Sequence, residues 1–207
     1  MYRAIHERRD IRHFLPDPVA PEVLQRLLMA AHYAPSVGYM QPWRFIRITN
    51  PQLRGTLCEL VEQERQRTAE ALGEREDEFM RLKVEGIREC GEVLVTALMD
   101  QRENHIFGRR TLPEMDLASV ACAIQNIWLA ARAEGLGLGW VSIFDPEQLR
   151  LALNMPEGAK PVAILCLGHV EAFYPRPMLE TEGWDTRREL ADLVFENTWT
   201  AGLPATE

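Results

Sequence analysis

The sequence predicts an α+β domain, or a three-layer α/β/α domain, on three observations. Helix-like and strand-like segments alternate along the chain, as they do where helices cover a sheet. Residues 92–99 and 161–170 are short apolar runs rich in branched side chains, which is typical of buried strands. Residues 114–134 form a long helix that is apolar almost all round. With 207 residues, of which 46% are hydrophobic, the chain can bury a full core, so we expect one domain over 1–207.

The first half of the chain predicts a helix, a strand and a second helical region. Residues 21–34 form the first helix, because Pro21 suits the first helical position and leucines repeat on one face. The loop APSVGYMQPW ends this helix, and the alternating residues 43–49 predict a half-buried strand. Residues 52–89 are highly charged, with weak helical periodicity and a break at Gly73. We therefore expect a solvent-facing, lid-like helical insertion there.

In the second half, the buried strand at 92–99 leads through a polar loop to the long helix at 114–134. Because this helix is apolar on more than one side, we predict that it packs against a second copy of the chain in a homodimer. A glycine-rich turn and a short strand follow, then a helix at 146–153 and the apolar strand at 161–170. The tail at about 171–207 carries large aromatic side chains, and we expect it to wrap the partner subunit.

The charge balance argues against nucleic acid or a membrane as the main partner. The formal net charge is -8 and the pI is about 5.3, whereas both partners are bound through basic surfaces. The sequence has no run of about 18 apolar residues that predicts a membrane-spanning helix. Its charged start, MYRAIHERRD, does not have the pattern of a secretory signal. We expect a cytoplasmic protein.

The cysteines and histidines predict neither disulfides nor a metal site. Cys58, Cys90, Cys122 and Cys166 are scattered through apolar stretches and form no C-x-x-C pair, which favours buried, reduced thiols. The five histidines show no H-E-x-x-H motif and no close Cys/His spacing.

The segment ERRDIR, residues 7–12, gathers three arginines around Asp10 in an acidic chain. Two interpretations compete: an anion-binding turn, because guanidinium groups make bidentate contacts to phosphate, or a solvated face at the end of a short helix. The glycine-rich turn at 135–139 ends a helix and enters a strand, the reverse of the dinucleotide-binding order. Its first glycines suit a helix end and tight turn, while Gly139 could let backbone approach a flat ligand. No nucleophile elbow, phosphate loop or catalytic triad is visible, which favours a cofactor as the source of reactivity.

Three spaced segments resemble the nitroreductase superfamily. ERRDIRHF followed by APSVGYMQPW resembles its flavin-binding opening, and AIQNIWLAARAEGLGLGWVSIF resembles its dimer-interface helix and the turn beneath the flavin. The resemblance implies a mostly antiparallel central sheet with helices on both faces, and bound FMN. With the terminal GW and LVFENTW, these segments are most similar to a branch that breaks down reduced FMN with dioxygen. The implied products are 5,6-dimethylbenzimidazole, the lower ligand of cobalamin, and erythrose 4-phosphate.

The resemblance also implies roles for individual residues. FMN would be a substrate, supplied in reduced form by a separate flavin reductase. Its binding residues would be Arg8, Arg9, Arg12 and Arg187 at the phosphate and ribityl region, Pro35, Ser36, Gly38 and Met40 along the ring, and Lys83 and Gly139. Lys83 is expected on a charged helix, where a solvated role is the alternative. Ser142 falls beside the position of flavin N5, and Asp10 stands where reductases of the superfamily mostly carry serine. Both are predicted to be catalytic, with Asp10 able to act as a base.

A second function stays open from the sequence, an NAD(P)H-dependent nitro- or quinone reductase that retains its FMN. Such an enzyme needs an open face over the flavin ring for its second substrate. The charged residues at about 63–88 could instead close that face, and Asp10 favours fragmentation. A flavin binder without catalysis is the third, non-enzymatic interpretation.

Overall fold

The computed structural model describes residues 1–199. The chain divides into a main unit, Met1–Pro175, and a C-terminal unit, Arg176–Glu207. The expectation of a single domain over the whole chain, with a lid-like insertion, stays a prediction.

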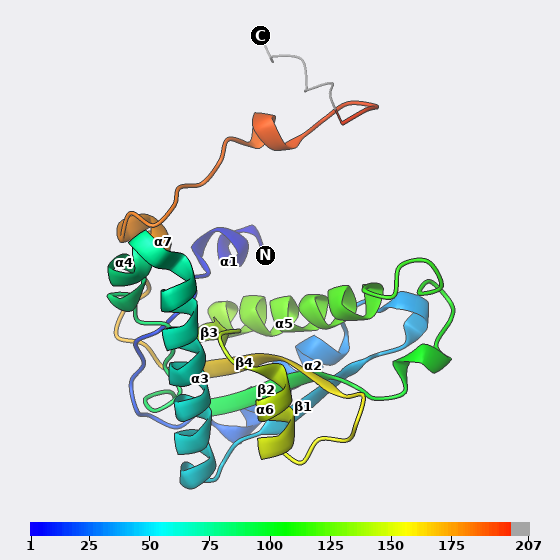
Figure 1. Cartoon of the computed structure of the whole chain (residues 1–207), viewed down its shortest axis with the longest axis horizontal. Helices are drawn as coiled ribbons and strands as arrows, with labels where there is room; N and C mark the ends of the chain where they lie inside the picture. The colour runs from blue at the N-terminus through cyan, green and yellow to red at the C-terminus, as the bar shows by residue number, and fades with distance from the viewer. Residues whose placement is uncertain (200–207) are drawn as a thin grey trace. The chain divides into compact units, whose positions relative to one another are not determined.

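Within the described residues, the main unit is built around one sheet of four strands in the order β1-β2-β4-β3 (Figure 1). All the pairings between neighbouring strands are antiparallel. The strands are β1 (Trp43–Arg47), β2 (Glu92–Leu98), β3 (Gly137–Val141) and β4 (Lys160–Gly168). The two central strands are buried on both faces, which is why their sequences are continuous apolar runs instead of alternating ones. The predicted α+β class and the antiparallel sheet are confirmed.

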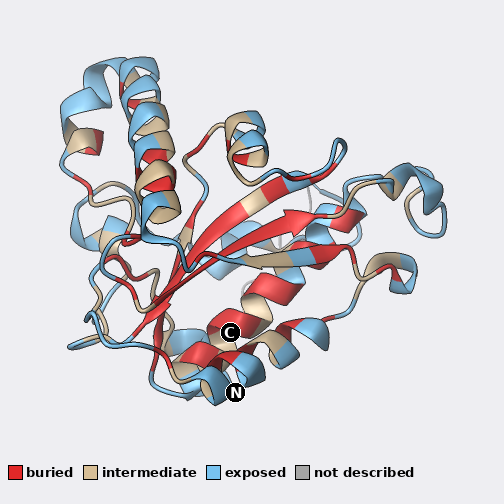
Figure 2. Cartoon of the chain, turned by 90° about the horizontal axis from the view of Figure 1, so that it is seen from below, coloured by how far each residue is buried: buried red, intermediate tan, exposed pale blue. Residues whose placement is uncertain are grey.

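Helices cover both faces of the sheet, as predicted. On one face lie α2 (Pro21–His32) and α5 (Met115–Ala133), and on the other α3 (Pro51–Leu72) and α6 (Pro146–Ala152). Successive side chains of a strand point to opposite faces, so each central strand contributes to both cores. The core under α2 and α5 takes Leu94, Leu98 and Leu165, and the core under α3 and α6 takes Val93, Val95 and Ile164. Figure 2 shows these buried residues concentrated along the strands and the inner sides of the helices.

The remaining elements of the main unit are short. They are α1 (Tyr2–Glu7), η1 (Val37–Tyr39), η2 (Gly73–Arg75), α4 (Glu76–Met80) and η3 (Arg102–Asn104). The predicted break at Gly73 is confirmed, because its φ of +56° lies in the left-handed region that ends α3. Gly135 ends α5 in the same way, with a φ of +78°. None of the helices within residues 1–199 is both long enough and apolar enough to cross a membrane.

The cysteine prediction is correct for three of the four thiols. All four are free, and Cys58, Cys90 and Cys166 are buried. Cys122 is exposed on α5, so the prediction of a buried thiol there was wrong. The reason is that the chain itself buries only one side of this apolar helix, and Cys122 lies on the other side.

The C-terminal unit contains α7 (Met178–Thr181) and η4 (Leu190–Leu193). Near its described end the rings of Phe195 and Trp199 stack, with their centroids 5.2 Å apart. Both side chains are exposed. That this tail wraps a partner subunit stays a prediction, and residues 200–207 lie outside the described residues.

Candidate functional site

The segment that follows α1 lies along the free edge of β3. Asp10 forms an isolated parallel bridge with Leu138, and the Ile11 N–H donates to the Leu138 carbonyl at 3.0 Å. Farther along the strand, the Trp140 N–H donates to Oδ1 of Asp10 at 2.8 Å. The Asp10 carboxylate therefore accepts the Trp140 N–H, which on this free edge of β3 has no neighbouring strand to bind.

Glycine at two positions of β3 allows this close approach. A Cβ at Gly139 would lie 2.2 Å from the Ile11 carbonyl oxygen and 2.7 Å from Nη1 of Arg12. A Cβ at Gly137 would lie 2.6 Å from the side chain of Val170. The backbone that approaches Gly139 is thus the chain's own N-terminal segment. A contact of Gly139 with flavin stays a prediction.

Asp10 and Arg12 form a bidentate ion pair, which we call the clamp. Nη1 of Arg12 lies 2.6 Å from Oδ1 of Asp10, and Nη2 lies 2.7 Å from Oδ2. The same two nitrogens donate to the carbonyls of Ile11, at 3.2 Å, and of Trp140, at 3.0 Å. Arg12 is only 8% exposed. The predicted role of Arg12 at the FMN phosphate stays a prediction, and it would require Arg12 to release these acceptors.

The environment of Asp10 suits proton transfer. Burial by the surrounding protein raises the pKa of Asp10, and this effect exceeds the opposing influence of Arg12, the Trp140 N–H and Arg8. The side chain is nevertheless 44% exposed, so one side of the carboxylate can meet a ligand. A carboxylate that is accessible and has a raised pKa accepts and returns a proton more readily than an ordinary aspartate does.

Arg8 and Arg9 supply positive charge beside the clamp. The guanidinium of Arg8 lies 4.9 Å from the centroid of the Trp128 ring. Arg9 donates to the carbonyls of His6, Arg8 and Pro175, at 2.8, 2.7 and 3.0 Å. Within residues 1–199, neither arginine forms an ion pair with a carboxylate, and the buried Nε of each has no hydrogen-bond partner. Two cations without a matching anion are the donor set that a phosphate monoester requires.

Ser142 lies immediately after the end of β3 and is exposed. It follows Trp140 by two residues, so the two side chains would lie on the same side of a continued strand, with Cα atoms about 7 Å apart. Because the Trp140 backbone binds Asp10, the structure brings both predicted catalytic residues to the same end of β3.

The loop expected along the flavin ring, residues 35–41, which we call the Gly38 loop, is held in an unusual backbone conformation. Oγ of Ser36 accepts a hydrogen bond from the Gln41 N–H at 3.0 Å. Gly38, Tyr39 and Gln41 have φ values of +52°, +54° and +49°. A Cβ at Gly38 would also lie 2.6 Å from the carbonyl oxygen of Phe107. Left-handed non-glycine residues cost about 1–3 kcal/mol each and concentrate at ligand-binding sites. Pro35 is exposed and Met40 is buried.

Within one chain this loop and the clamp lie toward opposite ends of α5. The Val37 N–H donates to Oγ of Ser119 at 3.0 Å, whereas Nε1 of Trp128 donates to the Arg9 carbonyl at 3.1 Å. Trp128 follows Ser119 by nine positions in the helix, a rise of about 14 Å. The structure therefore does not bring Pro35, Ser36, Gly38 and Met40 together with the clamp in a single chain.

Two other predicted binding residues lie apart from these elements. Lys83 is in the loop after α4, not on a helix, which corrects the sequence prediction: the helix already ends at Met80. Nζ of Lys83 pairs with Oε1 of Glu89 at 2.8 Å. Arg187 is an exposed residue of the C-terminal unit. The contacts of Lys83 and Arg187 with flavin stay predictions.

Tyr174 and Trp128 belong to the site but were not predicted from the sequence. The hydroxyl of Tyr174 accepts the Arg12 N–H at 3.2 Å and lies 2.7 Å from Nδ1 of His13. Tyr174 and Arg12 are 162 residues apart in the chain, so no local pattern could connect them. Trp128 is one of many apolar residues in α5, so its hydrogen bond to the Arg9 carbonyl has no sequence pattern. Only the resemblance of its segment to the nitroreductase superfamily indicated a functional region.

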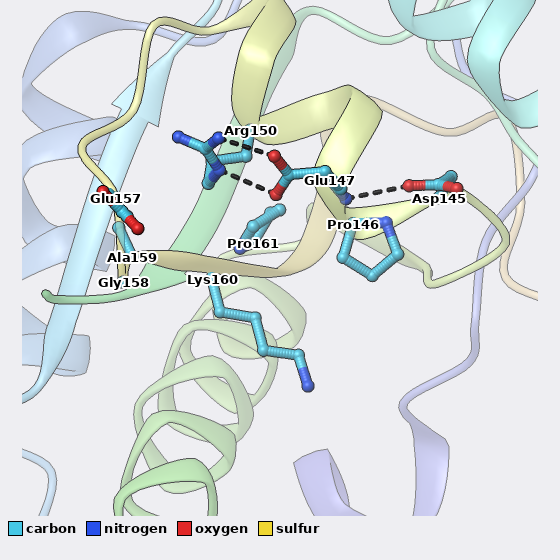
Figure 3. A pocket seen from close by; sticks show the side chains of 9 residues that line it. All are labelled: Asp145, Pro146, Glu147, Arg150, Glu157, Gly158, Ala159, Lys160 and Pro161. Carbon is cyan, nitrogen blue, oxygen red and sulfur yellow. Dashed lines mark hydrogen bonds and ion pairs between the residues drawn. The ribbon is translucent and has the colours of Figure 1, made fainter.

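A separate hollow of about 690 Å³ lies beside α6 and the start of β4 (Figure 3). Its lining residues are Asp145, Pro146, Glu147, Arg150, Glu157, Gly158, Ala159, Lys160 and Pro161. The guanidinium of Arg150 is already engaged by Glu147, at 2.6 and 2.8 Å, and by the Met155 carbonyl. Asp145 caps α6 by accepting the N–H groups of Glu147 and Gln148. Because Arg150 is engaged and three carboxylates line this hollow, it is not a second candidate anion site.

The model of the Nitroreductase family matches residues 5–169 of the chain. The chain belongs to the nitroreductase family. The chain is 43% identical over 185 residues to the 5,6-dimethylbenzimidazole synthase of Rhodospirillum rubrum, with 87% of each sequence covered. It is 40% identical over 179 residues to the enzyme of the same name in Rhodobacter capsulatus, with 86% of each covered. The predicted branch of the family is thereby confirmed.

The fold of the chain is also similar to that of solved structures. The crystal structure of oxidised iodotyrosine deiodinase bound to FMN and 3-iodo-L-tyrosine superposes with a TM-score of 0.74. The identity is 24%, and the match covers 96% of this chain and 99% of that one. At this identity the likeness supports the fold alone.

Proposed function

We propose that the protein is a 5,6-dimethylbenzimidazole synthase, which uses dioxygen to fragment reduced FMN into 5,6-dimethylbenzimidazole and erythrose 4-phosphate. The observation that carries this proposal is Asp10, an accessible carboxylate held within the arginine segment where related reductases mostly carry serine. The identity to named synthases over most of the chain supports the same reaction.

The residues fit reduced FMN as the ligand. Arg8 and Arg9 have no carboxylate partner within residues 1–199, and they would hold the phosphate. Reduced FMN, when bound, supplies the ring that reacts with dioxygen. Since each turnover consumes the flavin, a separate flavin reductase would have to supply it. The free thiols of Cys58, Cys90 and Cys166 support a reducing, cytoplasmic location.

The protein's own contribution is proton transfer and orientation. Ionised Asp10 can accept a proton from the bound ligand on its exposed side, while the Trp140 N–H and Arg12 hold its oxygens in place. The hydroxyl of Ser142, at the same end of β3, can donate a hydrogen bond to the ligand or pass a proton.

We also propose that the active form is a homodimer that pairs the outer face of α5. This face carries Ala118, Cys122 and Ala133, which are all exposed in the chain. A two-fold axis perpendicular to α5 would run the two helices antiparallel, so that the clamp of one chain lies near the Gly38 loop of the other. This arrangement would complete two sites, each formed by the clamp of one chain and the Gly38 loop of the other.

The test is to add chemically reduced FMN to the purified protein in air and to measure 5,6-dimethylbenzimidazole by chromatography. The proposal expects product and a matching loss of flavin. A parallel assay with oxidised FMN, NADH and a nitroarene tests the alternative function, an FMN-retaining reductase. NADH oxidation coupled to nitroarene reduction, without flavin loss, would identify an FMN-retaining reductase instead. If neither activity is found, the protein binds flavin without catalysis.

A further inference from the structure

We propose that Arg12 is a positioning residue for Asp10 and not a ligand of the FMN phosphate. The kinetic consequence rests on the proposed function, whereas the pairing itself is a property of the chain. Arg8, Arg9 and Arg12 look equivalent in the sequence, so the distinction between them comes only from the structure.

The terminal nitrogens of Arg12 are already engaged. Each donates to one oxygen of Asp10 and to one backbone carbonyl, so four acceptors face its four terminal hydrogens. The remaining donor, Nε, is buried and has no partner among the described residues. A phosphate could reach the terminal nitrogens of Arg12 only by displacing one of these acceptors, Asp10 or a backbone carbonyl. Arg8, by contrast, has no acceptor within residues 1–199 and is held by the ring of Trp128.

The surroundings of Arg12 are built to hold it in this position. Its backbone N–H donates to the hydroxyl of Tyr174 at 3.2 Å. Its guanidinium passes over β3 where residue 139 is glycine, and a Cβ there would lie 2.7 Å from Nη1. Burial to 8% exposure limits the alternative rotamers of the side chain. A bidentate contact also fixes the plane of the carboxylate, which a single hydrogen bond would not do.

The pair sets both the orientation and the charge of Asp10. The charged groups that act on the carboxylate are Arg12, on its own segment, and Arg8, at the end of α1, together with the Trp140 N–H of β3. Arg12 is the largest of the influences that oppose the effect of burial. Without it, burial would raise the pKa of Asp10 further, and the carboxylate would become protonated at a higher pH.

A double-mutant cycle tests the assignment. We expect Arg12→Gln to lower product formation per bound FMN by about tenfold or more, as the loss of a positioned base does. In an Asp10→Asn background the same change should add less than about a twofold effect, because Arg12 would have nothing left to position. Arg12 is not a positioning residue if the two effects multiply.

The affinity for reduced FMN, measured without oxygen, distinguishes the role of Arg12 from that of Arg8. Arg12→Gln should weaken affinity by less than about threefold, whereas Arg8→Gln should weaken it by about tenfold or more, since it removes a charge-assisted contact. Thermal unfolding of each variant confirms that it is folded. Equal losses of affinity in the two variants would overturn the proposal, because Arg12 would then also be a ligand.

A measurement on the protein alone keeps this inference separate from the proposed function. The carboxyl carbon of Asp10, labelled with carbon-13, is titrated by NMR in the wild type and in Arg12→Gln. The proposal expects a higher midpoint in the variant. An unchanged midpoint would overturn it whatever reaction the enzyme performs. If the midpoint rises but no 5,6-dimethylbenzimidazole forms in the wild type, the proposed function fails and the pairing stands.

Discussion

At the scale of single residues, Asp10 has two roles that depend on each other. Its Oδ1 satisfies the backbone N–H of Trp140, and both its oxygens bind Arg12. The carboxylate is therefore part of the structure before any ligand binds. A base whose orientation is set in advance needs little reorganisation during the reaction.

Asp10→Asn is expected to separate binding from chemistry. The amide is similar in size and can still accept the Trp140 N–H, but it cannot take up a proton near neutral pH. We expect product formation to fall by about 100-fold or more. The affinity for reduced FMN should stay within a few-fold of wild type. A variant that makes product at the wild-type rate would remove Asp10 from the mechanism.

The pH dependence of the wild type follows from the same residue. Product formation requires ionised Asp10, so it should fall as the pH is lowered through the pKa of this group in the folded protein. Because burial raises that pKa, the loss should begin at a higher pH than for an ordinary aspartate. The check is the rate of 5,6-dimethylbenzimidazole formation against pH at saturating reduced FMN. A rate that stays constant down to the acid-unfolding limit would contradict this role.

Gly139→Ala should disturb the clamp and destabilise the fold. The new Cβ would lie 2.2 Å from the Ile11 carbonyl oxygen, so the N-terminal segment would have to shift away from β3. We expect a loss of about 1–3 kcal/mol in unfolding free energy, measured in denaturant. Gly55→Ala is the matched control: its Cβ meets nothing within 4 Å, and in the interior of α3 it should stabilise by about 0.5–1 kcal/mol. Equal effects at the two sites would contradict this explanation.

The sequence could predict which residues matter near the start of the chain, but not how they divide their roles. The arginine cluster and Asp10 stand out in an acidic sequence because of their charge. That the Trp140 backbone binds both Arg12 and Asp10, and that Gly139 accommodates Ile11, depends on segments about 130 residues apart in the chain. Tyr174 has no pattern of its own. Such long-range contacts leave no spacing or periodicity in one sequence.

At the scale of elements, the strands and main helices were predicted within a few residues. Burial on both faces of β2 and β4 leaves a strong apolar signal, and helix starts were marked by Pro21 and Pro146. The error at Lys83 arose because charged residues continue past the end of α4, so composition did not mark the helix end. The error at Cys122 arose because the apolar sequence of α5 does not show which of its sides the chain itself buries.

A charge on the outer face of α5 should prevent the proposed dimer. Cys122→Glu places a carboxylate on an exposed position of the chain, so the fold should tolerate it. We expect the sedimentation mass to fall toward that of a single 23.7 kDa chain. Ala71→Glu, at an exposed position of α3, is the control and should leave the mass unchanged. If both variants keep the mass of two chains, this face is not the interface.

At the scale of the whole molecule, the division of the site is the main feature. The segment that carries the clamp, through the Arg9 carbonyl, and the Gly38 loop, through the Val37 N–H, contact α5 at points about 14 Å apart. A single chain would then hold one half of each of two sites. The order of the motifs in the sequence cannot show this division. The order is the same whether two motifs form a site within one chain or between two chains.

Complementation between two inactive variants tests this arrangement. Asp10→Asn removes the base of one half, and Gly38→Val disrupts the other, because its side chain would meet the Phe107 carbonyl at a φ of +52°. In a mixed dimer one of the two sites combines both intact halves. After the two variants are unfolded and refolded together, we expect about a quarter of wild-type activity. The double variant, refolded alone, is the control and should stay inactive.

If the mixture is no more active than its parts, both halves of a site come from the same chain, and the proposed pairing of α5 is wrong.

The segment that carries Asp10 also closes the sheet. β3 is an edge strand, and residues 10 and 11 cover the side of it that would otherwise display unpaired backbone groups. An uncovered edge is a template for pairing with another molecule and for aggregation. Loss of this segment would therefore expose the protein to misassembly, and on the proposed function it would also remove the catalytic base. On the proposed function, the same twelve residues would serve both catalysis and resistance to aggregation.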